Sequence, residues 1–81
     1  GFYVQAEYHT SNGRIDLLIG TDDYVYIIEL KFEGSAMDAL EQINNKDYAL
    51  PFNTTGKQII KIGANVSKET RNIDEWIVDK N

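Results

Sequence analysis

The chain has 81 residues, 42% hydrophobic and 26% charged, a balance that excludes a disordered or fibrous protein and fits one small domain. It contains no cysteine, which excludes a disulfide framework and any cysteine-based zinc site or nucleophile. The net charge of −5 excludes tight DNA binding by electrostatic attraction alone, because free-standing nucleic-acid binders are usually basic. No apolar run approaches about 20 residues, so we expect no membrane span.

The N-terminal third predicts an antiparallel meander of three strands. Residues 2–10 alternate apolar and more polar side chains with a period of two, which is typical of a strand. Asn12-Gly13 predicts a type I′ hairpin turn, whose two central residues need a positive φ. Residues 14–20 form the second expected strand. Residues 24–32 form the third, which is apolar on both faces, as a central strand would be.

A helix is expected after the meander. Ser35 followed three residues later by Asp38 resembles a capping box. One helical stripe of apolar side chains follows, made of Ala36, Ala39, Leu40 and Ile43. The helix should end near Tyr48, before Pro51.

The C-terminal part predicts a crossover back into the sheet. Residues 53–56 read as a loop and residues 58–64 as a fourth strand, so the helix should lie on one face of the sheet in a right-handed connection. Residues 67–71 form a polar turn. Residues 73–78 fit either a helical or a period-two pattern, and we favour a short edge strand. Residues 1–81 are thus expected to form a single α/β domain. Because a strand begins almost at Gly1, without a leader, we expect it to be part of a longer protein.

Three ionisable residues lie inside apolar strands: Asp16, Glu29 and Lys31. Such groups are costly to desolvate unless they are paired or bind a cation. Glu29 and Lys31 are two residues apart, so they share a face, and the hairpin places Asp16 across from Glu29. Paired carboxylates favour a hard divalent cation, which lowers the pKa of bound water, and a neighbouring lysine offsets developing negative charge. The three residues therefore predict a metal-dependent site for phosphodiester hydrolysis.

Asp16, twelve residues and then Glu29-Leu30-Lys31 resemble the D…E-x-K motif of the PD-(D/E)XK nuclease superfamily. A longer string resembles the nuclease-like domain at the C-terminus of bacterial AAA-ATPase-like proteins, over about residues 3–76. That string consists of Gly13-Arg14-Ile15-Asp16, Tyr26-Ile27-Ile28-Glu29-Leu30-Lys31, Ala39-Leu40-x-Gln42-Ile43 and Tyr48-Ala49.

The resemblance implies a restriction-endonuclease-like αβββαβ core, with the first core helix missing from this chain and lying upstream of Gly1. It implies that Asp16 and Glu29 bind Mg²⁺ or Mn²⁺, with the Leu30 carbonyl as a further ligand. Lys31 would be the catalytic lysine, and DNA the substrate.

Some members of the superfamily carry Gln-x-x-x-Tyr on the helix after the third strand. Gln42 matches the glutamine, and we expect it to support the site. Lys46 stands where the tyrosine would be, and Tyr48 comes two residues late. Lys46 is a candidate phosphate contact, although a solvated lysine is the simpler interpretation.

Two further residues have alternative interpretations. Superfamily members often carry an upstream glutamate as an auxiliary metal ligand, and Glu7 is the candidate here, although it lies on an expected strand. Arg14 either contacts the substrate or pairs with Glu7. His9 and the aromatic residues, Trp76 included, are expected to be surface or packing residues.

The favoured function is Mg²⁺-dependent hydrolysis of DNA in the bacterial cytoplasm, with DNA and an N-terminal ATPase portion of the same chain as partners. One alternative is a nuclease-fold module without catalysis that docks to or regulates its ATPase, which the negative charge and the missing first helix favour. Another is a structural domain whose exposed aromatic side chains mediate a homodimer.

Overall fold

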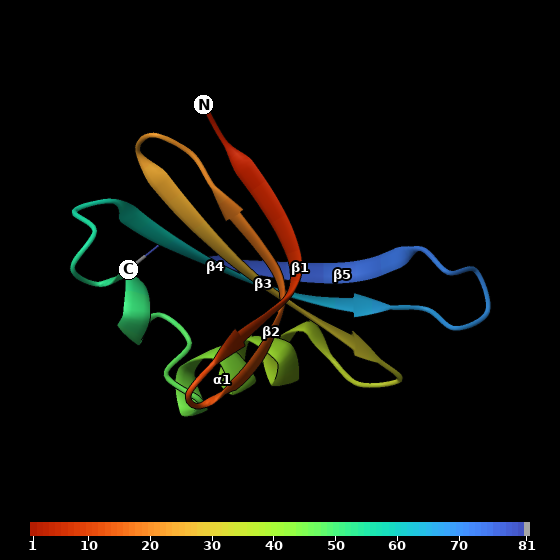
Figure 1. The fold of residues 1–81 in the computed structure, drawn as a ribbon. Coiled ribbons are helices and arrows are strands. Elements are labelled where there is room, and N and C mark those ends of the chain that lie inside the picture. The colour runs from red at the N-terminus through yellow and green to blue at the C-terminus, as the bar shows by residue number, and fades with distance from the viewer. Residues whose placement is uncertain (81) are drawn as a thin grey trace.

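The computed structural model describes residues 1–80, which form one five-stranded sheet with a single α-helix on one face (Figure 1). The elements in chain order are β1 (Tyr3–Thr10), β2 (Gly13–Gly20), β3 (Tyr24–Phe32), α1 (Ala36–Asn45), a short 3₁₀ helix η1 (Leu50–Phe52), β4 (Gln58–Val66) and β5 (Ile73–Asp79). The strand order is β1-β2-β3-β4-β5. Only the β3–β4 pair is parallel. The predicted meander, crossover helix and fourth strand are confirmed. Neither helix in the described part of the chain is long and apolar enough to cross a membrane.

The turn between β1 and β2 differs from the prediction. Thr10 pairs with Gly13, so the turn centres on Ser11 and Asn12, one residue earlier than expected, and Asn12 does not have a positive φ. Gly13 instead lies in β2 with a φ of 146°, and a Cβ there would approach the Tyr48 hydroxyl to 2.8 Å. Both the φ of residue 13 and the nearby Tyr48 side chain therefore favour a glycine at this position in β2.

Helix α1 begins as predicted and ends earlier. The Ser35 hydroxyl accepts a hydrogen bond from the backbone N–H of Asp38 at 3.0 Å, which caps the first turn. The helix ends at Asn45, not near Tyr48, because Asp47 adopts a φ of 52° and the Tyr48 N–H reaches back to the Ile43 carbonyl at 3.1 Å. This is the 6→1 bond of a Schellman motif, and it turns Tyr48 into the core.

The core lies between α1 and one face of the sheet. Its buried side chains form one cluster: Ile15, Leu18, Val25, Ile27, Leu40, Ile43, Tyr48 and Phe52. Helix and sheet approach most closely at Gly63 of β4, where a Cβ would lie 2.3 Å from the Ala36 carbonyl oxygen and 2.6 Å from the Leu40 nitrogen. The absence of a side chain at this position lets α1 lie directly on β4.

This close approach predicts that Gly63→Ala is strongly destabilising. The added methyl group meets backbone atoms of α1, which cannot move away without shifting the helix, so we expect a loss of at least about 2 kcal/mol in unfolding free energy. Urea unfolding measures the loss. The matched control is Gly34→Ala, whose Cβ meets nothing closer than the Lys31 Cβ at 3.4 Å. Equal unfolding midpoints for the two variants would contradict the close contact.

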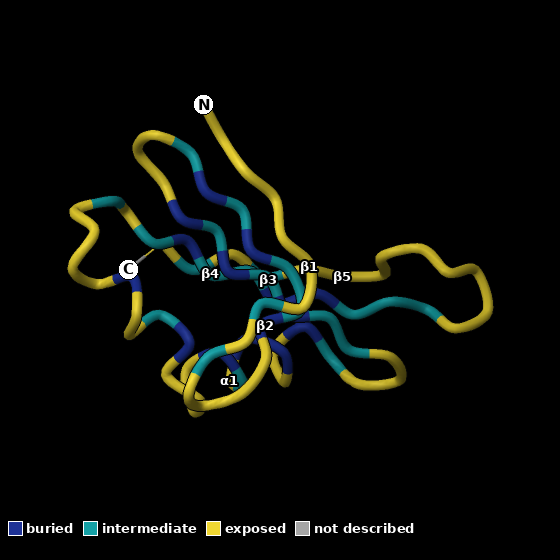
Figure 2. Tube along the Cα trace, in the orientation of Figure 1, coloured by how far each residue is buried: buried dark blue, intermediate teal, exposed yellow. Residues whose placement is uncertain are grey.

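The residue range 73–78, which the sequence left ambiguous, is a strand. β5 runs antiparallel to β4, with Trp76 opposite Ala64 and Val78 opposite Ile62 on the sheet face away from α1. Trp76 is 64% exposed, and β1 and β5, the edge strands, are exposed over most of their length (Figure 2). No second helix covers the far face of the sheet among residues 1–80.

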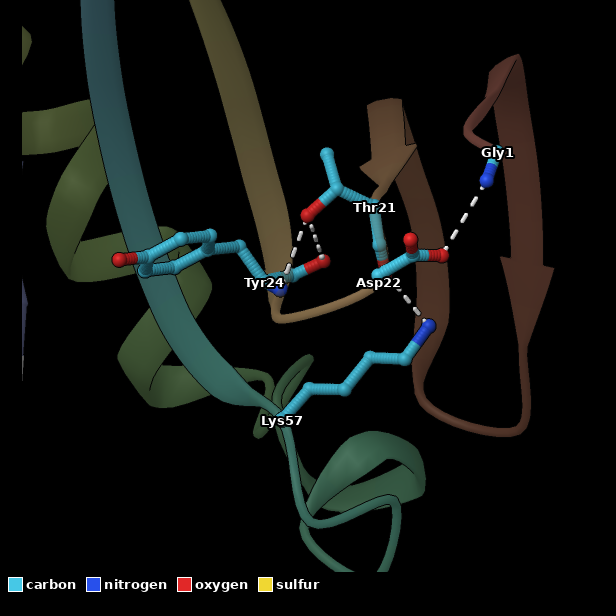
Figure 3. A network of polar contacts seen from close by, with 5 residues as sticks. All are labelled: Gly1, Thr21, Asp22, Tyr24 and Lys57. Carbon is cyan, nitrogen blue, oxygen red and sulfur yellow. Dashed lines mark hydrogen bonds and ion pairs between the residues drawn. The ribbon is translucent and has the colours of Figure 1, made fainter.

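Polar contacts join the β2–β3 turn to the start of β4 at the end of the sheet where β3 begins (Figure 3). Lys31 lies near the other end of β3. The Thr21 hydroxyl accepts a hydrogen bond from the Tyr24 N–H at 2.9 Å, and the Lys57 ammonium donates to the Thr21 carbonyl at 2.7 Å. The Gly1 nitrogen lies 3.2 Å from Asp22 Oδ1. These contacts fix the β2–β3 turn against the start of β4.

Candidate active site

Asp16 and Glu29 lie next to each other where the pairing of β2 with β3 stops. Leu17 pairs with Ile28, and Asp16 and Glu29 are the next residues along the two strands. Asp16 Oδ2 accepts a hydrogen bond from the Leu30 N–H at 2.9 Å. A side chain of β2 therefore accepts a hydrogen bond from the backbone of β3, and this bond holds the Asp16 carboxylate against β3.

Glu29 is the buried carboxylate of the site. It is 3% exposed, and it is the one charged side chain in the core among residues 1–80. Its Oε1 accepts a hydrogen bond from Gln42 Nε2 at 3.0 Å. Its Oε2 is buried and accepts no hydrogen bond from a protein donor, and the Asp16 carboxyl is the polar group beside Glu29. An unpaired carboxylate oxygen in a protein interior is costly, so Oε2 is a position where a further ligand would be stabilising.

The environment favours the neutral form of Glu29. Burial, and then the neighbouring Asp16 carboxyl, raise the pKa of Glu29 to about 8, while the Lys31 ammonium lowers it. Desolvation and a like charge both penalise the ionised carboxylate. Without a bound cation, most Glu29 side chains therefore carry a proton at neutral pH.

Gln42 connects Lys31 to Glu29. The Lys31 ammonium donates a hydrogen bond to Gln42 Oε1, while the amide nitrogen of Gln42 donates to Glu29. Both residues of β3 thus reach the same side chain of α1, as their shared face predicts. The two contacts fix both ends of the Gln42 amide, and the Lys31 ammonium is near enough to lower the pKa of Glu29.

The donor set fits a divalent cation that keeps much of its water shell. Asp16 and Glu29 supply two carboxylates, one of them with an unpaired oxygen, and within residues 1–80 no three His, Asp or Glu side chains form a larger metal-binding group. Mg²⁺ is usually bound through one or two carboxylates together with water and substrate phosphates. The Leu30 carbonyl stays a predicted further ligand.

Glu7 and Arg14 pair with each other. Arg14 Nη1 lies 3.0 Å from Glu7 Oε1, and both side chains are more than half exposed. Glu7 lies opposite Asp16, between the pairs Ala6–Leu17 and Tyr8–Ile15, yet its φ of 56° is left-handed and its carboxylate is bound to Arg14. Of the two interpretations of Arg14, the structure shows the pairing with Glu7.

Lys46 and Tyr48 lie at the C-terminal end of α1. Lys46 is the C-cap residue and lines a groove of about 310 Å³ together with Asn12, Asn45 and Asp47. Tyr48 is 2% exposed and belongs to the core. Tyr48 therefore has a packing role. Lys46 is an exposed lysine that follows Gln42 by four residues, which is about one helical turn.

Two residues that the sequence did not single out hold the segment after Lys31. Asn65 Oδ1 accepts a hydrogen bond from the Gly34 N–H at 3.1 Å, and Glu75 Oε1 accepts one from the Ala36 N–H at 2.8 Å. Both belong to the β4–β5 half of the sheet. Only the register of these strands brings them to the start of α1, so no local sequence pattern could have revealed them.

A family model described as the PD-(D/E)XK nuclease superfamily matches residues 1–76. The chain belongs to this superfamily. Its mixed α/β sheet is consistent with the restriction-endonuclease-like core of PD-(D/E)XK nucleases, which generally use divalent metals. Membership suggests a nuclease-type function.

A longer protein resembles the whole chain. An uncharacterized protein in the vnfD 5′ region of Azotobacter chroococcum mcd 1 is 32% identical over 81 residues, which cover 98% of this chain and 16% of that protein. The chain thus spans about a sixth of the length of this relative. No solved structure matches the chain.

Proposed function

We propose that this PD-(D/E)XK domain hydrolyses DNA phosphodiester bonds with Mg²⁺ or Mn²⁺ held by Asp16 and Glu29. The observation that carries the proposal is the buried Glu29 carboxyl, whose Oε2 accepts no hydrogen bond, beside a second carboxyl, that of Asp16. Two adjacent carboxyl groups at a buried position are costly to ionise, and a bound cation would stabilise their ionised form.

Each residue of the site has a distinct role in this proposal. Asp16, oriented by the Leu30 N–H, and Glu29, oriented by Gln42, bind the cation, and the Leu30 carbonyl completes the protein ligands. When bound, the cation polarises the phosphate and lowers the pKa of water. Lys31 orients the attacking water and offsets the negative charge that develops on the phosphate.

Contacts to DNA outside the reacting phosphate must overcome the net charge of −5. We assign a phosphate contact to Lys46, one helical turn beyond Gln42, and a weaker one to Arg14, which would have to leave Glu7. We propose that most of the affinity for DNA comes from an ATPase portion of a longer bacterial cytoplasmic protein. The long relative is compatible with this arrangement.

A metal titration tests the proposal. Isothermal titration with Mg²⁺ and Mn²⁺ at pH 7 should show binding at millimolar or lower concentrations, and the Asp16→Asn variant should bind at least tenfold more weakly. Because the pKa of Glu29 is about 8, binding should also release close to one proton, which titrations in buffers of different ionisation enthalpy measure. A flat titration at millimolar metal would contradict the proposal.

The acidic charge favours one alternative, a non-catalytic module that kept the nuclease fold and serves as a docking or regulatory domain of its ATPase. That function predicts no metal-dependent DNA cleavage, even in the full-length protein. A homodimer through exposed aromatic residues such as Trp76 is tested separately by the solution mass, and a clean monomer would exclude it.

A further inference from the structure

Helix α1 is tied to β4 and β5 at both of its ends. At its N-terminus the Glu75 carboxylate accepts a hydrogen bond from the Ala36 N–H at 2.8 Å, and near its C-terminus the Lys61 ammonium donates to Asn44 Oδ1 at 2.7 Å. The strands that make these ties carry no residue of the candidate active site. Their polar side chains nevertheless help to hold α1 in place on the sheet.

The tie at Ala36 cannot be replaced from within the helix. Ala36 is fully buried and its N–H is the first of the helix, so it has no intrahelical acceptor. The local cap, Ser35, uses its hydroxyl for the Asp38 N–H instead. Glu75 supplies the missing acceptor from a strand 39 residues away, and its negative charge lies at the positive end of the helix dipole.

The position of α1 in turn sets the position of Gln42. Gln42 follows Ala36 by six residues, which places it about 9 Å further along the helix axis. Its amide must meet Glu29 at 3.0 Å and Lys31 at the same time. A displacement of α1 by about 1 Å would take at least one of these two bonds outside the usual range of about 2.7–3.2 Å.

We propose that Glu75 is a positioning residue for the active site, acting through α1 on the Gln42 bridge between Glu29 and Lys31. Its effect on catalysis rests on the function proposed above, whereas its effect on Gln42 does not. Glu75 lies on an edge strand and would contact neither the cation nor the substrate.

The side-chain amide resonances of Gln42 in the metal-free chain give a test that needs no activity. Glu75→Ala should shift both Gln42 amide proton resonances by more than a line width. Glu75→Gln, which keeps an acceptor oxygen, should leave them in place. Asp74→Ala is the matched control, because Asp74 is the exposed acidic neighbour on the same strand. Unshifted Gln42 resonances in Glu75→Ala would overturn the proposal. If Glu75→Ala fails to fold, Glu75→Asp, which shortens the side chain by one methylene, replaces it. Shifted Gln42 resonances are then expected, and unshifted ones would overturn the proposal.

Cleavage kinetics then separate positioning from a general loss of stability. In the full-length protein Glu75→Ala should lower kcat roughly tenfold with KM changed less than twofold, and Glu75→Gln should restore kcat to within threefold of the wild type. An unchanged kcat in a folded Glu75→Ala protein would contradict the proposal. If the wild-type protein does not cleave DNA, that result contradicts only the proposed function. The Gln42 resonances would still test the role of Glu75.

Discussion

Replacing Lys31 with Met is expected to lower the rate of metal-dependent DNA cleavage by about 10³-fold while metal binding survives. Lys31 donates to Gln42, and the hydrogen bonds that orient the two carboxylates come from other groups. Its ammonium lowers the pKa of Glu29, so its removal should weaken Mg²⁺ binding only modestly, by less than tenfold. The large loss falls on the chemical step, where a preorganised positive charge stabilises the developing negative charge.

Two variants make this result specific. Asp16→Asn should lose both metal binding and cleavage, because it removes a proposed ligand and keeps the size of the side chain. Lys68→Met is the matched lysine control, because Lys68 is an exposed lysine that pairs with Glu33 at 3.3 Å and, among residues 1–80, makes no hydrogen bond or ion pair with α1 or the two carboxylates. Single-turnover cleavage with titrated Mg²⁺ measures all three variants. Cleavage by Lys31→Met at the rate of Lys68→Met would refute the catalytic role of Lys31.

The juxtaposition of Asp16 and Glu29 could be predicted because it depends on one hairpin. Once residues 14–20 and 24–32 pair around a short turn, the register places these two residues opposite each other. The alternation along β3 likewise puts Glu29 and Lys31 on one face. Burial follows from the same pattern, since the neighbours of Glu29 on that face are core residues such as Ile27.

The features that could not be predicted depend on contacts between distant segments. Gly13 lies in β2 beside the Tyr48 side chain, and α1 ends at Asn45, where a left-handed Asp47 lets Tyr48 enter the core. The contact of Gln42 with Glu29 was expected only through the family resemblance, because it depends on how α1 crosses the sheet. The contact of Glu75 with Ala36 depends on the β4–β5 register, which no local pattern encodes.

Glu29 should make the metal-free domain less stable as the pH rises. Its pKa is about 8 in the folded protein and 4.5 as its ordinary value, so between about pH 4.5 and 8 the folded state holds a proton that the unfolded state has lost. Stability falls with pH wherever the folded state binds more protons. The contribution is fully present below pH 4.5 and is lost as the pH approaches 8. At about 1.4 kcal/mol for each unit of pKa difference, the loss over this window is roughly 4 kcal/mol.

Glu29→Gln should remove this pH dependence and abolish cleavage in the same protein. The amide introduced by this substitution is a neutral counterpart of the protonated acid, because it can still accept from Gln42 and can donate toward Asp16. The stability of the variant should therefore match the wild type near pH 5 and exceed it by a few kcal/mol at pH 8. Urea unfolding with a chelator at several pH values measures both curves, with Glu41→Gln, on the exposed face of α1, as the control.

Adding Mg²⁺ should stabilise the wild type at pH 8, because the cation favours the ionised carboxylate, and should leave Glu29→Gln unchanged. The same unfolding curves, repeated with Mg²⁺ in place of the chelator, measure this difference. Parallel pH curves for wild type and Glu29→Gln would mean that the pKa of Glu29 is close to its ordinary value. Ionised Glu29 would then not destabilise the metal-free domain, and a bound cation would have no such destabilisation to relieve.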